Sequence, residues 1–239
     1  MVSKVIFAIT HEETRFQLNG ALLKVLPDRM EMCATDGHRM ALVNLPQESE
    51  KKTKKGEDLT ILIPRKALHE LMRIDSGDAG TIRFGVSENH LFFEAAETLL
   101  MARLIDVNFP NYMEVIAKDN DRKVIVDRER LLATIRRVSL VANERTRAVR
   151  FDFAPGKLTV SSTNPELGDA RETVAVEYAG APFHVGLNAA YVTDFLSALP
   201  TTGVSLELKD ENSQCIARPL ESDALPYDYT YVVMPMRIA

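Results

Sequence analysis

The densest cluster of residues able to do chemistry is TDGHR, at Thr35 to Arg39. A histidine beside an aspartate can act as a general acid–base pair, and Cys33 lies two positions upstream as a candidate nucleophile. Asp-Gly is a strong turn signal, however, and Cys33 lies in an apolar run that favours burial over reactivity. Three interpretations therefore remain: a structural turn, which the pattern favours, a recognition loop, and a hydrolase site that lacks an orienting group.

Other catalytic and metal-binding patterns are missing from the sequence. The five histidines show no ligand spacing, and there is neither a glycine-rich phosphate loop nor a GxSxG elbow. Cys33 and Cys215 lie far apart, which predicts reduced, buried thiols in a cytoplasmic protein. We therefore expect no catalytic residue, no metal site and no cofactor.

Basic residues gather on the predicted helices although the chain has a net charge of −5. Two interpretations fit this pattern. The helices present an ordinary solvated surface, or they form a positive face that binds a polyanion through the polyanion's backbone and not by stacking on bases. The basic residues concerned are Lys4, Arg65, Lys66, Arg73, Arg128, Arg130, Arg136 and Arg137.

The C-terminus is unusually apolar for a chain end. It reads YVVMPMRI at 231–238, with one charge and two methionines, the side chain that adapts best to varied partners. Such a segment must be buried. The pattern predicts either a terminal strand and a tail packed on its own domain, or a tail that binds a partner.

The whole chain has the size and composition of a soluble protein with one or two domains. It has 239 residues, of which 46% are hydrophobic and 26% charged, and no apolar run approaches the about 20 residues of a membrane span. Its halves look alike, with matching features offset by roughly 125 to 130 residues, which is a domain-scale repeat.

Each half is predicted to contain two helices and about eight strands. Helical patterns begin near Val5 and Leu131, and later helices are predicted at 64–73, with Pro64 in its first position, and at 188–198, with Asn188 as its N-cap. Alternating strands are expected at 22–34, 81–86, 90–95, 149–161, 203–209 and 213–218. The predicted fold is α+β, two tandem copies of one unit with helices packed on antiparallel sheets.

The predicted domains span residues 1–117 and 118–239. The join falls near the polar, turn-rich stretch 117–122, AKDNDR. The charged stretch 48–58, ESEKKTKKGED, is predicted to be a solvated loop between strands, because acidic residues bracket its lysines.

Several motifs together resemble the bacterial sliding clamp family, the beta subunits of DNA polymerase III. They span nearly the whole chain in the family's order, and ATDGHR with the VVMPMR terminus is the most specific pair. The motifs are TRFQLNG at 14–20, ATDGHR at 34–39, IPRK at 63–66, LMR at 71–73, FPNY at 109–112, SLVANE at 139–144 and YVVMPMR at 231–237.

The resemblance implies two of the three clamp-fold repeats that a family protomer contains, namely the middle and C-terminal domains. We expect a fragment or a shortened clamp without the N-terminal domain and the start of the middle domain. In the family two protomers form a ring around duplex DNA, and the ring interface here would include Leu140 and Val141. The DNA-facing residues would be Lys4, Arg65, Lys66, Arg73, Arg136 and Arg137.

The resemblance further implies a DNA sliding clamp, a non-enzymatic processivity factor and homodimer. Its partners would be duplex DNA, the DNA polymerase III alpha subunit, the clamp loader and other proteins with clamp-binding motifs, but no membrane. The alternative is a two-domain fragment that cannot form a ring and acts as a monomeric peptide-binding module.

The family's partner-peptide cleft lies between these two domains. Thr146 and Gln214 occupy cleft positions that vary in the family, and Glu114 stands where a basic residue can occur. The cleft residues implied by the resemblance are Leu18, Thr35, Gly37, His38, Arg39, Met40, Pro110, Val115, Asn188, Tyr191, Val232, Val233, Met234, Pro235, Met236 and Arg237.

Overall fold

The computed structural model describes residues 1–12, 14–47, 58–75, 80–220 and 225–238. These residues form two compact units, one of residues 1–112 with 226–228 and the other of residues 113–225 with 229–239. The main chain passes from one unit to the other after Tyr112, and the domain boundary after residue 117 stays a prediction. Of the predicted charged loop at 48–58, residues 48–57 lie outside the described residues.

The first unit opens with a short helical segment. Helix α1 (Val2–Val5) continues into the 3₁₀ turn η1 (Ile6–Ala8), and a second 3₁₀ turn, η2 (Phe16–Leu18), follows. Val5, Ala8 and Ile9 are almost fully buried, so the apolar side of this segment packs into the unit as its sequence pattern predicts.

A four-stranded antiparallel sheet follows in the order β4-β1-β2-β3. Leu22 of β1 pairs with Cys33 of β2 on one side and with Leu62 of β4 on the other. Gly20 begins β1 where a Cβ would collide with the carbonyl of Ile63, so the close approach of the two strands requires glycine. The strands are β1 (Gly20–Val25), β2 (Arg29–Thr35), β3 (Arg39–Pro46) and β4 (Leu59–Pro64).

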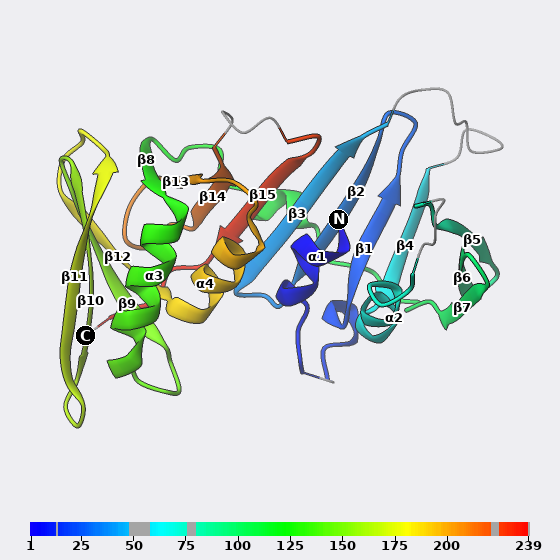
Figure 1. The fold of residues 1–239 in the computed structure, drawn as a ribbon, viewed down its shortest axis with the longest axis horizontal. Coiled ribbons are helices and arrows are strands. Elements are labelled where there is room, and N and C mark those ends of the chain that lie inside the picture. Colours follow the sequence, from blue (N-terminus) through cyan, green and yellow to red (C-terminus); the bar gives the residue numbers. More distant parts are fainter. Residues whose placement is uncertain (13, 48–57, 76–79, 221–224, 239) are drawn as a thin grey trace. The chain divides into compact units, whose positions relative to one another are not determined.

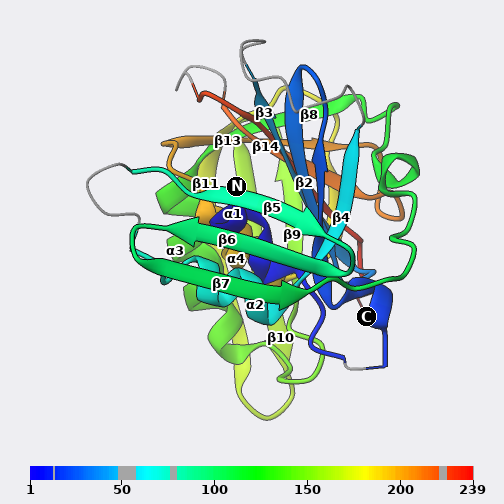
Figure 2. The same cartoon turned by 90° about the vertical axis from the view of Figure 1, so that its right-hand side faces the viewer.

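Helix α2 (Arg65–Leu71) begins directly after β4. Pro64 was expected at the first helical position, but it is the N-cap: its ψ of 142° is extended, so the helix starts one residue later. Beside α2, three antiparallel strands form a second sheet in the order β5-β6-β7 (Figure 2). They are β5 (Arg83–Ser87), β6 (His90–Ala95) and β7 (Thr98–Arg103).

Tyr112 is the last residue of the first unit's main stretch, at the start of η3 (Tyr112–Val115). Its hydroxyl donates to Oε2 of Glu31 at 2.6 Å, and Nε of Arg29 donates to Oε1 of the same carboxylate at 2.7 Å. Burial pushes the pKa of Glu31 up, but the hydrogen bonds from Tyr112 and Arg29 outweigh it and hold the pKa below its ordinary value.

This carboxylate predicts a pH dependence of stability. Because the pKa of Glu31 is lower in the folded chain than the ordinary 4.5, its contribution is present above pH 4.5 and is lost as the pH falls through the folded pKa. We expect Glu31→Gln to flatten the acid side of the curve of unfolding free energy against pH, measured by urea titration between about pH 7 and pH 3. An unchanged acid slope would contradict the assignment, and Glu97→Gln serves as an exposed control.

The second unit is built on an antiparallel sheet in the order β12-β9-β10-β11-β8-β13-β14-β15 (Figure 1). Helix α3 packs on β8, β10 and β11 and on α4, and α4 packs on β12. The helices are α3 (Arg128–Val138) and α4 (Ala189–Ala198), with the 3₁₀ turn η4 (Ser139–Val141) after α3. The strands are β8 (Arg122–Asp127), β9 (Ala148–Ala154), β10 (Lys157–Asn164), β11 (Gly168–Glu177), β12 (Phe183–Asn188), β13 (Gly203–Leu208), β14 (Cys215–Pro219) and β15 (Asp228–Val233).

Both helices of this unit are capped by side chains. The carboxylate of Asp127 accepts from the backbone N–H of Arg130 at 2.8 Å, and the amide oxygen of Asn188 accepts from Ala190 and Tyr191. The prediction of Asn188 as an N-cap is therefore confirmed. The predicted apolar face of α3, which includes Leu131 and Ile135, is buried.

The α+β prediction is confirmed: the described residues of each unit contain two helices packed on antiparallel strands. Within the described residues, none of the helices has the length and apolar character that a membrane crossing requires.

Candidate functional site

The TDGHR cluster folds as a tight turn between β2 and β3 that is held by its own side chains. Oδ1 of Asp36 accepts from the backbone N–H groups of His38 and Arg39 at 2.9 and 3.0 Å. Thr35 Oγ1 donates to the carbonyl of Arg39 at 2.6 Å and accepts from the N–H of Gly37. Gly37 has a φ of +90°, a conformation that strains any other residue. The predicted turn is confirmed, and its role as a recognition loop stays a prediction.

Arg39 fixes this turn to the opening helical segment of the same unit. Its Nε forms an ion pair with Oδ2 of Asp36 at 3.0 Å, and its Nη2 donates to the carbonyl of Phe7 at 2.5 Å. The guanidinium also lies over the Phe7 ring, 5.5 Å from its centre. Since both oxygens of Asp36 bind backbone groups or Arg39, the carboxylate is occupied with holding the turn.

Neither cysteine has the setting of a nucleophile. Cys33 and Cys215 are buried free thiols. Burial raises the pKa of Cys33 far above its ordinary value and that of Cys215 to about 12, so both stay protonated and unreactive at neutral pH. In the described part of the chain, no group of three His, Cys, Asp or Glu side chains could hold a metal ion.

The C-terminal tail packs on its own unit. After β15, the backbone N–H of Met236 donates to the carbonyl of Gly186 in β12 at 2.8 Å, forming an isolated bridge. A Cβ on Gly186 would collide with the Met236 carbonyl and would lie 2.7 Å from Cγ2 of Ile238, so the tail requires glycine here. The tail is therefore packed on its own unit, and binding of a partner by its exposed side chains stays a prediction.

An aromatic stack connects the tail strand to helix α4. The ring of Phe195 lies parallel to that of Tyr231, with centres 4.6 Å apart, and 5.3 Å from that of Tyr229. The hydroxyl of Tyr231 donates to the carbonyl of Tyr191 at 2.9 Å. The predicted cleft residue Tyr191 is thus held to the strand from which the tail extends.

The predicted cleft residues divide between the two units. Within the first unit, the structure brings Thr35 to Met40 together in one turn and the start of β3. Within the second unit, Tyr231 of the tail strand contacts Tyr191 at the start of α4. Met236 of the tail forms a bridge with Gly186. Gln214 donates to the carbonyl of Val115 at 3.2 Å. The buried members are Leu18, Arg39, Met40, Val232 and Val233, and the others are exposed or partly exposed.

We did not predict from the sequence three residues that hold the predicted cleft residues in position, namely Gly186, Phe7 and Phe195. An isolated glycine in the alternating run FHVGLN carries a signal, because glycine within a strand often marks a close approach of another backbone. Phe7 acts through its backbone carbonyl and its ring, and no local pattern connects it to Arg39, 32 residues away.

The predicted DNA-facing residues differ in whether an acidic side chain already pairs with their positive charge. Arg137 forms two hydrogen bonds of 2.6 Å with the Glu172 carboxylate, which raise the pKa of Arg137 and lower that of Glu172. Arg136 donates to the neutral hydroxyl of Ser197 at 3.3 Å. Arg136 therefore offers its full charge to a polyanion, whereas Arg137 must share its charge with Glu172.

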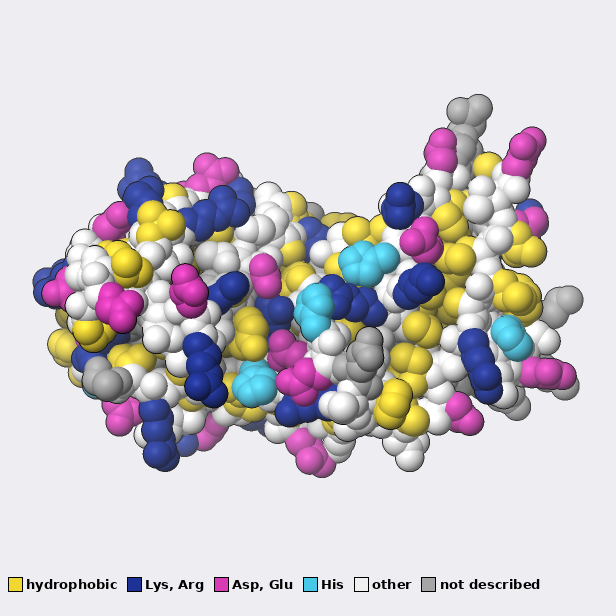
Figure 3. Space-filling view, turned by 90° about the horizontal axis from the view of Figure 1, so that it is seen from below, with side chains coloured by type: hydrophobic (Ala, Val, Ile, Leu, Met, Phe, Trp, Pro, Cys, Tyr) yellow, Lys and Arg dark blue, Asp and Glu magenta, His cyan; other side chains and the backbone are white. Residues whose placement is uncertain are grey.

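In the first unit, Arg65 contacts two histidines: Nη1 lies 2.6 Å from Nδ1 of His11, and Nε donates to His69 at 3.4 Å. Burial and the charge of Arg65 lower the pKa of His11, which favours a neutral ring and leaves the positive charge on Arg65. Arg73 forms an exposed ion pair with Glu70 at 3.6 Å. On the face drawn in Figure 3, acidic and basic side chains are interspersed.

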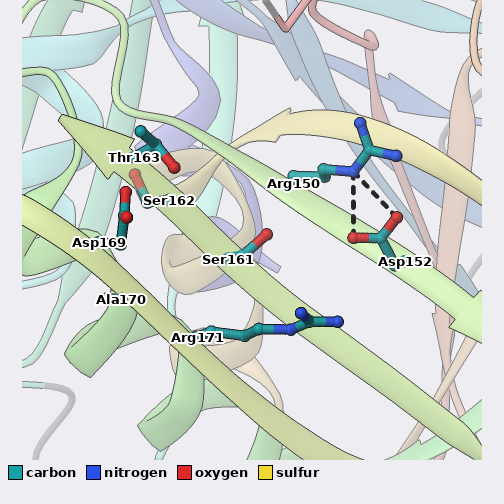
Figure 4. Close-up of a pocket in the computed structure, with 8 residues that line it drawn as sticks. All are labelled: Arg150, Asp152, Ser161, Ser162, Thr163, Asp169, Ala170 and Arg171. Carbon is teal, nitrogen blue, oxygen red and sulfur yellow. Dashed lines mark hydrogen bonds and ion pairs between the residues drawn. The ribbon is translucent and has the colours of Figure 1, made fainter. Parts of the chain in front are cut away.

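A shallow depression of about 540 Å³ lies on the second unit, and none of the predicted site residues lines it. Three neighbouring strands, β9, β10 and β11, supply its lining (Figure 4). Arg150 holds both oxygens of Asp152 through its Nε, at 2.9 and 3.0 Å. Arg171 and Asp169 come from β11.

Comparisons with known proteins give a consistent result. The family model described as the DNA polymerase III beta subunit, central domain, matches residues 1–111, and the model of the C-terminal domain matches residues 113–237. A beta sliding clamp of Pseudomonas putida is 32% identical over 238 residues, which is 100% of this chain and 63% of that protein. One of Escherichia coli K12 is 31% identical over 97% of this chain and 61% of its own length.

Solved structures agree with the sequence relatives. The DNA polymerase III subunit beta from Pseudomonas aeruginosa superposes with a TM-score of 0.91 at 31% identity, over 99% of this chain and 63% of its own. A beta sliding clamp from C. crescentus gives 0.90 at 32% identity, over 99% of this chain and 62% of its own. The chain thus spans a little under two thirds of the length of these relatives.

Proposed function

This chain belongs to the DNA polymerase III beta subunit family, the bacterial sliding clamps, and from this membership we propose that it acts in a DNA sliding clamp, as a non-catalytic processivity factor in the cytoplasm. The observation that carries the proposal is that two successive domain models of this one family match the chain in order. The occupied Asp36 carboxylate and the two protonated thiols support a role without catalysis.

A clamp works by topology. A ring around duplex DNA keeps a bound polymerase near its template and so raises the effective concentration of the polymerase. We propose that the ring is a homodimer with an interface that includes Leu140 and Val141, and Leu140 is 77% exposed in this structure. The proposed partners are duplex DNA, the DNA polymerase III alpha subunit, the clamp loader and other proteins with clamp-binding motifs.

We propose that the partner peptide is bound by two sets of residues, Thr35 to Met40 in the first unit and the start of α4 with the tail in the second. The hydrogen bonds that hold the turn and the bridge at Gly186 support this proposal, because preorganised walls lower the entropy cost of ordering the protein when a peptide binds. The exposed Met234 and partly exposed Met236 offer adaptable apolar contacts to varied motifs.

Contacts with DNA should be weak and made to phosphates, so that the clamp can slide. We expect Arg136→Glu to reduce DNA binding more than Arg137→Glu, because Arg137 already shares its charge with Glu172. The measurement is the dependence of duplex affinity on salt concentration, whose logarithmic slope should fall by about 0.9 for each phosphate that the variant no longer neutralises.

The matched control is Arg150→Glu, which makes the same charge change on β9, where Arg150 is paired with Asp152. Equal salt slopes for all three variants would contradict the DNA-facing assignment.

If the native chain stayed monomeric in sedimentation and still bound clamp-binding peptides, the alternative of a peptide-binding module would be supported instead.

A further inference from the structure

Arg65 lies between two histidine rings of the first unit. Its Nη1 is 2.6 Å from Nδ1 of His11, and its Nε donates to Nε2 of His69 at 3.4 Å. Arg65 and His69 are four positions apart on α2, so they share one side of that helix. His11 comes from the loop between η1 and η2, and both histidines are exposed. On the face drawn in Figure 3, histidine side chains lie beside basic ones.

Backbone hydrogen bonds anchor the two segments that meet here. The N–H of Thr10 donates to the carbonyl of Leu18 at 3.3 Å and closes the loop that contains His11. The carbonyl of Asn19, the next residue, accepts from the N–H of Arg65 at 3.0 Å. The contact between ring and guanidinium therefore joins two segments that the backbone already holds together.

This contact fixes the protonation states of both rings. A guanidinium is always charged and has only N–H donors, so Nδ1 of His11 and Nε2 of His69 must accept. Both rings are then neutral, with the hydrogen on Nε2 of His11 and on Nδ1 of His69. A metal ion would compete with the guanidinium for the same two lone pairs, so the chemistry of this cluster favours an anion over a metal.

The charges around His11 oppose its protonation in the free chain. Burial lowers the pKa of His11 most, followed by the charge of Arg65. The charges of Arg39 and His69 lower the pKa further, and only that of Asp36 raises it. A proton on Nδ1 of His11 would also turn the acceptor of Arg65 into a donor, with two cations in contact.

The described carboxylates near the cluster are already engaged. Asp36 uses both oxygens to hold its own turn. Glu12, directly after His11 in the chain, forms an exposed ion pair with Arg15 at 2.9 Å. On α2, Glu70 pairs with Arg73 at 3.6 Å. Among the described residues, the negative charge that would allow His11 to be protonated is therefore best supplied by a ligand.

We propose that His11, Arg65 and His69 form a proton-linked phosphate site, in which binding of a phosphate group is coupled to the uptake of one proton from solvent by His11. The phosphate oxygens accept from the guanidinium of Arg65 and from Nδ1–H of His11, so the anion lies between the two cations and removes their repulsion. The source of the phosphate is the backbone of duplex DNA. The inference thus rests on the proposed function and deepens it, because the DNA contact at Arg65 becomes stronger in acid.

The direction of the pH dependence can be worked out. In the free chain the pKa of His11 lies below its ordinary 6.5, and a bound phosphate raises it. Duplex affinity therefore increases as the pH falls through the pKa of the bound state and levels off below that of the free state. A phosphate contact made by Arg65 alone would not depend on pH in this range, because arginine does not titrate there.

His11→Gln separates the proton from the contact, because the amide oxygen of glutamine accepts from Arg65 but does not titrate. We expect the dissociation constant of the native chain for a short duplex to fall about twofold to fivefold from about pH 8 to about pH 5.5 at constant ionic strength. His11→Gln should lose this change and keep the affinity measured at the higher pH. The control is His90→Gln on β6, which should behave as the native chain does. Fluorescence anisotropy measures the affinities.

NMR of the histidine ring protons tests the site without DNA. When inorganic phosphate replaces chloride at the same ionic strength, the pKa of His11 should rise by about 0.3 to 0.7, which is the same linkage measured on the proton. Arg65→Gln should abolish this rise, since it removes the guanidinium that binds the phosphate together with His11.

The same pH dependence of duplex affinity in the native chain and in His11→Gln would overturn the proposal. So would a titration of the His11 ring that is identical in phosphate and in chloride. If the chain bound no duplex at any pH while His11 still responded to inorganic phosphate, the proposed DNA contact would fail and the site would stand as one for free phosphate.

Discussion

Deletion of residues 234–239 should lower the affinity for a fluorescent clamp-binding peptide by at least about 100-fold, since a few anchoring contacts dominate such binding. Met234, Pro235 and Met236 would supply these contacts in the proposed site. The strand β15 and its pairing with β14 end at Val233, so the deletion removes one bridge and leaves the sheet intact. Fluorescence anisotropy measures the affinity, and urea unfolding confirms that the fold is retained.

Gly186→Ala provides a sharper form of the same experiment, because it deletes no tail residue from the chain. The added Cβ would collide with the Met236 carbonyl and approach Ile238, so the tail must leave its position. We expect a similar loss of peptide affinity with little loss of stability. Gly85→Ala is the control for a glycine substitution, since no atom lies within 4 Å of a Cβ there and its φ lies outside the left-handed region.

Retained affinity in the deletion variant would refute the assignment of the tail to the peptide site. Loss of affinity in the deletion variant with full affinity in Gly186→Ala would mean that the tail binds without its bridge to β12.

Phe195→Ala should reduce the unfolding free energy of the second unit by about 3 to 5 kcal/mol. Phe195 is almost fully buried and stacks on Tyr231 while also contacting Tyr229. Removing the ring leaves a cavity at the junction of α4 and β15, and neither a helix nor a strand can collapse to fill it. Urea titration followed by circular dichroism measures the change.

Tyr231→Phe is the matched variant at the same junction. It keeps the stacked ring and removes the hydroxyl that donates to Tyr191, so it should cost about 1 kcal/mol. If the two variants were equally destabilised, the hydrogen bond would dominate over the packing of the rings, contrary to the geometry of this stack.

Much of the fold could be predicted because each half carries strong local signals. Asn188 as a helix cap, the apolar face of α3 and the turn at Asp36-Gly37 are all set by residues within a few positions of one another. The start of α2 was placed one residue early, because the φ of proline suits both the N-cap and the first helical position.

The tertiary parts of the candidate site could not be predicted in this way. The ion pair of Arg137 with Glu172 joins residues 35 positions apart, so counting basic residues on α3 overestimates its free charge. The bridge from Met236 to Gly186 joins residues still farther apart. The cleft residues came from the family resemblance, and their role in peptide binding remains a prediction.

The turn at Thr35 to Arg39 constrains how this sequence can evolve. Asp36 binds two backbone groups and Arg39, Thr35 binds both Gly37 and the backbone of Arg39, and Gly37 has a backbone conformation that other residues avoid. Effects of substitutions in such a network are not additive. A change at one position would alter which residues are tolerated at the others, so these positions should diversify together, through paired substitutions, or not at all.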